Sequence, residues 1–404
     1  MIGKTSGKII LIILSCFVLT GCWSSRELSE LAIATAIGID THEDGYKVTA
    51  QVINPGEIAG KALTTRTATT TYTATGKTLF EAIRKLTTVT PRKVYLSHIR
   101  IILVGQEMAE KGIAPALDFL SRDHEMRTDF AIAIAKGLQA EEVIKVLTPL
   151  EKVPANKISD SLQTSQDQWA PTKAVQLDEL ISSLTSEGKQ AVLTGIYVEG
   201  DPDQGAKLNN METTDPLTTV HVNHIGVFQG DKLIGWLNES ESKGFNYITD
   251  NISNTIGWVE CGESGTISAE VANSETNITV KLINNQLGIN INTKIKADIG
   301  EVQCDIDLYD QANIKKIEQK FEERTEQIIN SSITKAKEFK SDIFGFGEEI
   351  KRSQPKLWEE LKQNWNREFV NVKVELETEF KISRTGTTTE SFMRDIPEKN
   401  KGNE

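Results

Sequence analysis

Cysteine, proline and long hydrophobic runs are scarce in this sequence, and each scarcity excludes a class of protein. Four cysteines and ten prolines in 404 residues exclude a disulfide-dense scaffold and a proline-rich stalk. No apolar run approaches the ~20 residues that a membrane-spanning helix needs. Basic residues are also scarce relative to acidic ones. The chain has 45 lysines and arginines and 57 aspartates and glutamates, which gives a net charge of −12. That balance argues against nucleic-acid binding and against a polybasic membrane patch.

What remains is the composition of a folded, acidic protein of several domains. Hydrophobic residues make up 38% and charged residues 25% of the chain, which excludes disorder as a description of the whole. At about 100–200 residues per domain, the length predicts two or three domains.

The first 22 residues are typical of an export and lipidation signal. Lys4 and Lys8 precede an apolar run, Ile9–Leu19, that is too short to cross a ~30 Å hydrocarbon core. The run ends in Leu19-Thr20-Gly21-Cys22, which resembles the lipobox of bacterial lipoproteins. In a lipobox the cysteine sulfur receives a diacylglycerol, the bond before it is cut, and the new amine is acylated.

We therefore predict a signal peptide at residues 1–21 and a lipid anchor, S-diacylglycerol and N-acyl, on Cys22. The alternative is an ordinary signal peptide or a short buried helix that happens to contain this cysteine. Cleavage would remove two lysines and raise the net negative charge to −14. We expect anionic headgroups to repel such a body, so that the lipid alone anchors it.

Side chains that could carry chemistry form no catalytic or metal-binding pattern. The sequence lacks a nucleophile elbow, a zinc-protease motif and a phosphate-binding loop, and Gly345-Phe346-Gly347 lacks the third glycine of a dinucleotide fingerprint. His221 and His224 lie in a strand-like stretch, where positions three apart point to opposite faces. We expect no catalytic residues, no metal and no cofactor.

Two cysteines besides Cys22 remain in the mature chain, Cys261 and Cys304, 43 residues apart and each beside a strand-like run. A disulfide between them is conceivable after export. We expect two separate, partly buried thiols instead.

Hydrophobic periodicity predicts an α+β fold of three domains, each a mostly antiparallel sheet with helices packed on it. The domains are placed at residues 22–150, 151–252 and 253–390, followed by a disordered tail at 391–404. In the first, the threonine-rich stretch Thr64–Thr75 indicates an exposed or edge strand. In the second, the stretch Glu199–Pro216, rich in Gly, Asp and Asn, indicates a mobile loop.

The third domain has the clearest pattern. A long helix at 311–339 carries apolar residues at spacings of three to five, and its drifting register favours packing on a sheet over a coiled coil. Val372, Val374, Leu376, Phe380 and Ile382 then alternate with charged residues, which predicts a closing strand with one buried face.

Several motifs along the mature chain resemble those of the Ger(x)C family, the lipoprotein C subunits of nutrient germinant receptors in endospore-forming bacteria. They are Cys22-Trp23, Arg26-Glu27-Leu28, Leu31-Ala32, Gly38-Ile39-Asp40, Ser97-His98-Ile99-Arg100, Gly226-Val227-Phe228, Leu233-Ile234-Gly235-Trp236-Leu237, Asp342-Ile343-Phe344-Gly345-Phe346-Gly347, Pro355-Lys356-Leu357-Trp358, Trp365 and Arg384-Thr385-Gly386. One departure is Ser24, where the family often has an acid, which puts any local role of that acid in doubt.

The resemblance implies a non-enzymatic subunit of three α+β domains, anchored through Cys22 to the outer face of the spore inner membrane. Its implied partners are an A subunit with a membrane domain and a polytopic, transporter-like B subunit. The resemblance leaves open whether this subunit binds the nutrient, stabilises its partners or transmits the response. A substrate-binding lipoprotein of a transporter is the alternative, and it would require two similar lobes around a cleft. From the residues alone, the glycines of Gly345-Phe346-Gly347 permit a tight turn, and Trp236, Trp358 and Trp365 fill cores.

Overall fold

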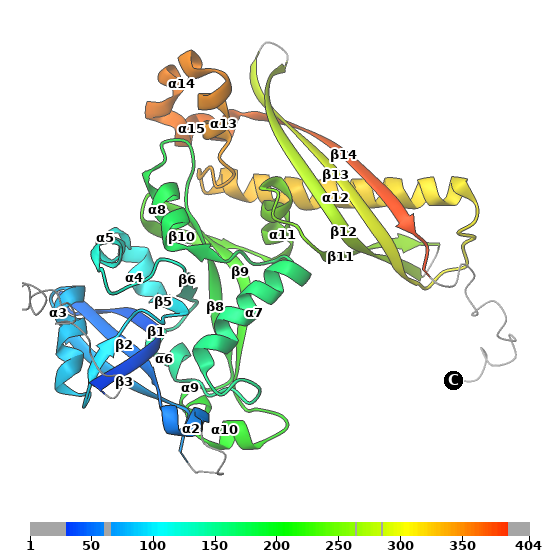
Figure 1. The fold of residues 1–404 in the computed structure, drawn as a ribbon. Coiled ribbons are helices and arrows are strands. Elements are labelled where there is room, and N and C mark those ends of the chain that lie inside the picture. Colours follow the sequence, from blue (N-terminus) through cyan, green and yellow to red (C-terminus); the bar gives the residue numbers. More distant parts are fainter. Residues whose placement is uncertain (1–29, 60–65, 263–264, 284–285, 387–404) are drawn as a thin grey trace, which may run out of the picture.

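A computed structural model describes residues 30–59, 66–262, 265–283 and 286–386. These residues form two connected parts, each built on one β-sheet (Figure 1). The predicted signal peptide at 1–21, the predicted anchor residue Cys22 and the predicted tail at 391–404 lie outside the described residues.

The first part contains a ten-stranded mixed sheet. In spatial order its strands are β10 (Lys232–Leu237), β9 (Thr219–Gln229), β8 (Val192–Glu199), β6 (Ala131–Ala135), β5 (Ile101–Gly105), β1 (Leu31–His42), β2 (Gly45–Ile53) and β3 (Thr69–Gly76), with β4 (Lys93–Tyr95) paired to β1 and β7 (Val175–Gln176) to β6. The central neighbours β1, β5, β6 and β8 run parallel. The pairs toward both ends of the sheet are antiparallel.

Helices cover both faces of this sheet and bury one apolar cluster on each. On one face lie α3 (Leu79–Lys85), α4 (Gln106–Lys111), α5 (Ala114–Arg122) and α8 (Leu177–Thr185), and on the other α6 (Ala140–Lys145) and α7 (Pro154–Gln168). Shorter helices follow the loops: α2 (Pro55–Ala59), η2 (Leu86–Thr88), α9 (Pro202–Gly205) and α10 (Asn209–Glu212). Buried Asp40, at the end of β1, accepts backbone hydrogen bonds from Ala140 and Glu141 and so caps α6.

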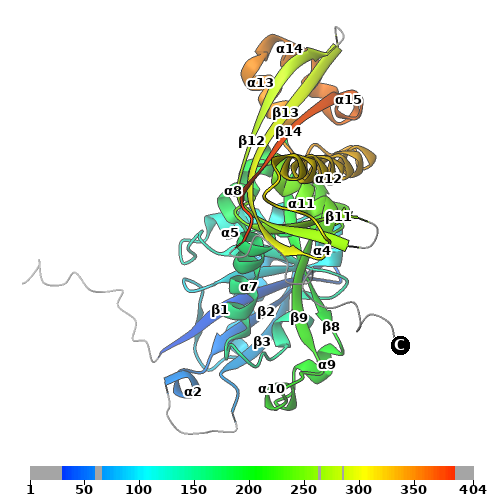
Figure 2. The same ribbon diagram turned by 90° about the vertical axis from the view of Figure 1, so that its right-hand side faces the viewer.

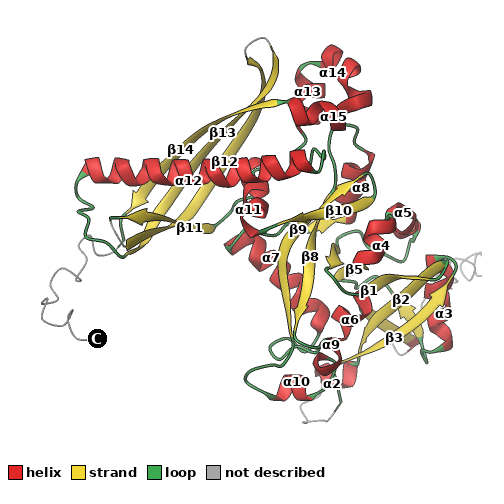
Figure 3. Ribbon diagram, turned by 180° about the vertical axis from the view of Figure 1, so that it is seen from behind, coloured by secondary structure: helices red, strands yellow, loops and turns green. Residues whose placement is uncertain are grey.

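The second part contains a four-stranded sheet in the order β11 (Thr255–Cys261), β12 (Gly265–Ile283), β13 (Gln286–Val302) and β14 (Lys373–Arg384). The helix α12 (Gln311–Glu338) lies along one face of this sheet (Figure 3). A group of short helices joins α12 to β14: α13 (Phe346–Ser353), α14 (Pro355–Leu361), η3 (Lys362–Asn364) and α15 (Trp365–Asn371). The helix α11 (Glu239–Ile248) leads from β10 into this part, and Asn238 caps it by accepting from the backbone N–H of Glu241.

The predicted long helix is confirmed as α12, and it packs on the sheet instead of forming a coiled coil. Asp310 caps its start by accepting from the backbone N–H of Ala312 at 2.8 Å. Ile314, Ile317 and Phe321 are buried against the strands, and the Phe321 ring stacks on Phe380 of β14 at 4.7 Å. The threonine-rich edge strand is likewise confirmed as β3 at the end of the first sheet, although Thr64 itself lies outside the described residues.

The α+β class is confirmed, but the described strands form two sheets and not three. β8 pairs with β6, so the strands expected in a middle domain extend the first sheet across residue 150. The sheets are also mixed, because β14 runs parallel to β13. Alternating apolar residues indicate that a strand has a buried face, but they do not specify which strand lies beside it or in which direction.

The expected mobile loop at Glu199–Pro216 is wrong, because this stretch contains α9 and α10. Asp201 caps α9 by accepting from the backbone N–H of Asp203. Buried Asn210 donates to the carbonyls of Leu147 and Thr218, both at 2.9 Å. A turn-rich composition therefore hides a segment tied to the sheet by hydrogen bonds from its own side chains.

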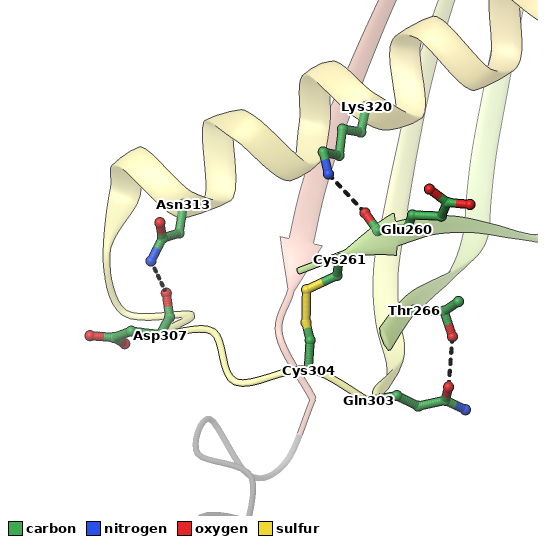
Figure 4. Close-up of a disulfide and its surroundings, with 8 residues drawn as sticks. All are labelled: Glu260, Cys261, Thr266, Gln303, Cys304, Asp307, Asn313 and Lys320. Atoms are coloured by element: carbon green, nitrogen blue, oxygen red, sulfur yellow. Dashed lines mark hydrogen bonds between the residues drawn. A yellow bond between two sulfur atoms is a disulfide. The ribbon is translucent and has the colours of Figure 1, made fainter. Parts of the chain in front are cut away.

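The expectation of two separate thiols is also wrong, because Cys261 and Cys304 form a disulfide with their Cα atoms 5.9 Å apart (Figure 4). Cys261 ends β11 and Cys304 follows β13, so β12 between them brings the two ends together. Around the bond, Lys320 of α12 donates to the Glu260 carbonyl at 2.8 Å, and Thr266 donates to the Gln303 side chain at 2.9 Å.

Candidate functional site: the junction between the two sheets

Most motifs from the second half of the chain converge where the two parts meet, whereas Arg384-Thr385-Gly386 lies at the far end of β14. Seen from the side in Figure 2, the four-stranded sheet rises above the ten-stranded sheet, with α11 between them. One apolar cluster spans this junction, since residues of β9 and β10 share it with α12, α13 and the second sheet. The junction is therefore a continuous core and not a flexible linker.

Asp342 is the polar centre of the junction. Its side chain is completely buried between α12 and α13. One carboxylate oxygen accepts backbone hydrogen bonds from Gly345 at 3.0 Å and Phe346 at 3.2 Å, and the other accepts from the Gly347 backbone at 2.8 Å and the Trp365 indole Nε1 at 2.9 Å. Burial raises the pKa of Asp342 to about 6, and these four donated hydrogen bonds act in the opposite direction.

The glycines of this motif allow the chain to turn and to approach its neighbour closely. Gly345 has φ of 83°, the left-handed region that glycine adopts without strain. A Cβ on Gly347 would lie 2.7 Å from the Cα of Gly188 and 2.7 Å from Trp365 Nε1. Gly188 belongs to the loop before β8, so this contact joins α13 to the first part. The tight turn predicted for Gly345 and Gly347 is confirmed.

Two hydrogen bonds connect the same segment to the first sheet. The Ser341 hydroxyl donates to the Phe228 carbonyl in β9 at 2.7 Å, and the Gln190 backbone N–H donates to the Asp342 carbonyl at 2.8 Å. A Cβ on Gly235 of β10 would lie 2.5 Å from the Phe339 ring, so the strand touches the end of α12 directly. Residues 339–342 therefore pair with the first part before the chain enters α13.

Aromatic rings fill the space around these contacts. Phe344 stacks on Phe346 at 5.2 Å, and Trp358 meets Trp365 edge-on at 5.5 Å. Trp358 and Trp365 are buried, as predicted. Trp236 is only partly buried, lies close to Gly195 and Gly226, and has the Lys136 ammonium 5.0 Å from its ring.

The hydrogen bonds of Asp342 hold the segments of the junction together. The one carboxylate at its centre is enclosed, and all its described partners are donors from the same chain. Within the described ranges, no three His, Cys, Asp or Glu side chains gather closely enough to hold a metal ion. Across the same residues, no helix is long and apolar enough to cross a membrane.

The remaining candidate residues lie elsewhere. Ser97-His98-Ile99-Arg100 lines a polar hollow in the first part, where Arg100 lies 3.5 Å from Asp160. His221 stacks on Tyr197 at 5.1 Å and lies 3.2 Å from Glu199. His224 has φ of 67°, and burial is the main cause of its lowered pKa. The two histidines thus have different neighbours.

Gly188, Gln190 and Ser341 take part in the junction, and sequence analysis did not single them out. Nothing in their local patterns marks them, since each contributes through its place in the fold.

Comparison with known proteins accounts for this architecture. Residues 24–198 match the family model described as spore germination protein N-terminal domain, and residues 223–386 match that described as spore germination B3/GerAC like, C-terminal. Spore germination protein KC of Bacillus subtilis is 30% identical over 386 residues, covering 93% of this chain and 95% of that protein. Spore germination protein B3 of the same organism is 23% identical over 393 residues, covering 95% of this chain and 99% of that protein.

A solved structure, described as the crystal structure of the GerBC protein, has the same fold with a TM-score of 0.53 at 18% identity, covering 86% of this chain and 96% of that chain. The class is therefore a two-sheet α+β protein related to spore germination proteins. The chain belongs to the Ger(x)C family, as its motifs predict.

Proposed function

We propose that this protein is a lipid-anchored, non-catalytic subunit of a membrane receptor for small nutrients that start spore germination. It would act at the outer face of the spore inner membrane together with the A and B subunits. The observation that carries the proposal is similarity to spore germination protein KC over nearly the whole chain. The lipobox-like Leu19-Thr20-Gly21-Cys22 supports the anchor.

The disulfide supports export of the mature chain. Disulfides persist in oxidising compartments outside the cytoplasm and are rare inside it. The Cys261–Cys304 bond joins the end of β11 to the chain just after β13, which fits a chain that folds after translocation.

Co-purification from dormant spores tests the receptor assignment. A tagged chain is crosslinked in spores, solubilised gently and captured, and we expect two membrane proteins, one polytopic, to accompany it. A tagged Cys22→Ala chain expressed at the same level shows how far capture depends on the anchor. Recovery of the wild-type chain alone after crosslinking would contradict the proposal.

The transporter-linked binding protein is the competing function. It requires two similar lobes around a ligand cleft, and the unlike ten-stranded and four-stranded sheets weigh against it. Thermal unfolding with added amino acids and sugars separates the two functions. A large stabilisation by one of these ligands would favour the binding protein.

A further inference from the structure

The surface of α3, η2 and β4 carries a local positive charge that the net charge of the protein conceals. Between Lys77 and Lys93 there are five basic side chains and one acidic side chain, a net charge of +4 in a chain of net charge −12. We call this segment, residues 77–93, the α3 surface. Lys77, Arg84, Lys85 and Arg92 are all exposed.

Apolar side chains are exposed among these cations. Phe80 is 49% exposed and Val89 is 50% exposed, while Leu79, Ala82 and Ile83 of the same helix face the core. The Arg84 guanidinium lies 5.0 Å from the Phe80 ring, one helical turn away. Phe80 in turn contacts Phe119 of α5 at 5.6 Å, so this aromatic side chain is held at the surface.

Neighbouring acids neutralise only part of this charge. Lys85 pairs with Glu81 at 2.7 Å, and Lys93 pairs with Glu125. Arg84 contributes to lowering the pKa of Glu125, after the hydrogen bond from Lys93, and Asp118 of α5 is paired with Arg122. Within the part of the chain that the structure describes, Lys77, Arg84 and Arg92 form no ion pair within 4.0 Å.

The start of the described chain places this surface near the predicted lipid anchor. Leu31, the first residue of β1, pairs with Lys93 of β4. Cys22 precedes Leu31 by nine residues, and an extended chain covers at most ~3.3–3.6 Å per residue, so the anchor lies within about 30 Å of β1. Figures 1 and 3 show α3 at the end of the molecule opposite the four-stranded sheet.

We propose that the α3 surface is seated on the bilayer and binds anionic phospholipid headgroups, with Phe80 and Val89 at the interface. Lys77, Arg84 and Arg92 are the contacting cations. This inference rests on the proposed anchor at Cys22 and goes beyond it, because it defines which face of the protein meets the membrane. The anchor supplies attachment, and the surface supplies orientation.

The net charge of the protein does not prevent this contact. At physiological salt, charges more than a Debye length of about 8 Å from the membrane are largely screened, so acids at the far end contribute little repulsion. Each basic side chain close to an anionic surface favours the seated orientation about fivefold. The overall composition predicts no basic membrane patch, but the local distribution of charge places one on the α3 surface.

Hydrogen exchange of the lipidated full chain on vesicles tests the proposal. Vesicles of phosphatidylcholine alone are compared with vesicles containing a third phosphatidylglycerol, and flotation is measured in parallel. We expect the amides of residues 79–89 to exchange at least about fivefold more slowly on the anionic vesicles. Lys77→Ser, Arg84→Ser and Arg92→Ser combined should abolish this difference while the protein still floats.

Two matched variants make the result specific. Lys294→Ser, Lys296→Ser and Lys315→Ser remove the same charge from exposed positions of the second part and should leave the protection unchanged. Arg84→Lys with Arg92→Lys keeps the charge and should retain it.

Floating wild-type protein with no difference between the vesicles would overturn the proposal and leave the anchor standing. Protection that appears only when other receptor subunits are present, whatever the lipid, would assign the surface to a protein partner instead. If the wild-type protein does not float, both the proposed lipid anchor at Cys22 and the proposed membrane contact of the α3 surface are wrong.

Discussion

Asp342 shows how one buried side chain can organise a connection between two sheets. Its carboxylate accepts from three consecutive backbone N–H groups and from the Trp365 indole, so it fixes the turn into α13 and the position of α15 together. A buried acceptor with four donors cannot be replaced by a donor without leaving N–H groups unpaired.

We predict that Asp342→Asn lowers the free energy of unfolding by about 1–3 kcal/mol at acid pH, because the amide nitrogen places two N–H groups among the donors where the protonated carboxyl places a single O–H. The difference in the free energy of unfolding between the wild type and the Asp342→Asn variant should become smaller as the pH rises. Burial raises the folded-state pKa of Asp342 to about 6, above its ordinary value of 3.8. The stability from binding this proton is fully present below pH 3.8 and is lost as the pH rises through about 6, a change of ~3 kcal/mol.

Urea unfolding from pH 3.5 to 7.5 checks this prediction, with exposed Asp215→Asn as the control for losing one negative charge. A stability difference between the wild type and the Asp342→Asn variant that stays constant over this range would show that the carboxyl does not titrate between these values.

At the scale of elements, the disulfide connects the ends of two strands that flank a third. Reduction, or Cys261→Ser with Cys304→Ser, should lower the free energy of unfolding by ~2–4 kcal/mol, since the bond closes a loop of 43 residues in the unfolded chain. Denaturant unfolding with and without dithiothreitol measures this. Wild-type protein in reductant should match the double variant, and an effect of reductant on the variant itself would contradict the assignment.

The strand β14 is held on both sides. It pairs with β13, and on its other edge Glu318 and Glu322 of α12 accept backbone hydrogen bonds from Ile382 and Phe380, both at 3.0 Å. Phe380 is buried, whereas Val374 and Leu376 are only half-buried. The helix therefore covers an edge that would otherwise be open to another strand.

Truncation after Asn371 should thus destabilise the second part by about 5 kcal/mol, through the loss of two buried apolar side chains, Val372 and Phe380, and several half-buried ones. That is a large share of the ~5–15 kcal/mol stability of a domain. Truncation after Arg394 should change nothing, because the residues removed, Asp395–Glu404, include almost no apolar side chain. Thermal unfolding of the two truncated chains and a germination assay in spores test both expectations. Equal thermal stability and equal germination for the two truncated chains would mean that β14 does not close the sheet.

At the scale of the molecule, the two parts share a core and should unfold together. Gly347→Ala would push a methyl group against the Gly188 backbone and the Trp365 indole. We predict that it lowers the free energy of unfolding by about 1–3 kcal/mol and broadens the transition, because the parts become partly independent. Gly56→Ala, where an added Cβ meets nothing within 4 Å, is the matched control.

The anchor acts on the whole molecule as well. We predict that Cys22→Ala leaves the two sheets folded and removes stable membrane attachment, because two acyl chains supply most of the affinity. Membrane fractionation after a high-salt wash, in cells lacking the partner subunits, measures the attachment. Variant protein that stays in the washed membrane fraction would contradict the prediction.

Local features of this protein were predictable from sequence because they depend on neighbouring residues. The edge strand β3 and the amphipathic helix α12 follow from residue composition and periodicity. The predicted anchor at Cys22 likewise depends on a contiguous run of residues, and it stays a prediction.

The sequence by itself thus determined the α+β class, the main elements of the second part and the family. Only the tertiary structure decided that β6 and β8 pair across the expected domain boundary, that β12 brings Cys261 to Cys304, and that Asp342 meets Trp365. Each of these contacts joins residues far apart along the chain. Periodicity shows which face of an element is buried, but the partner on that face is chosen by the packing of the whole chain.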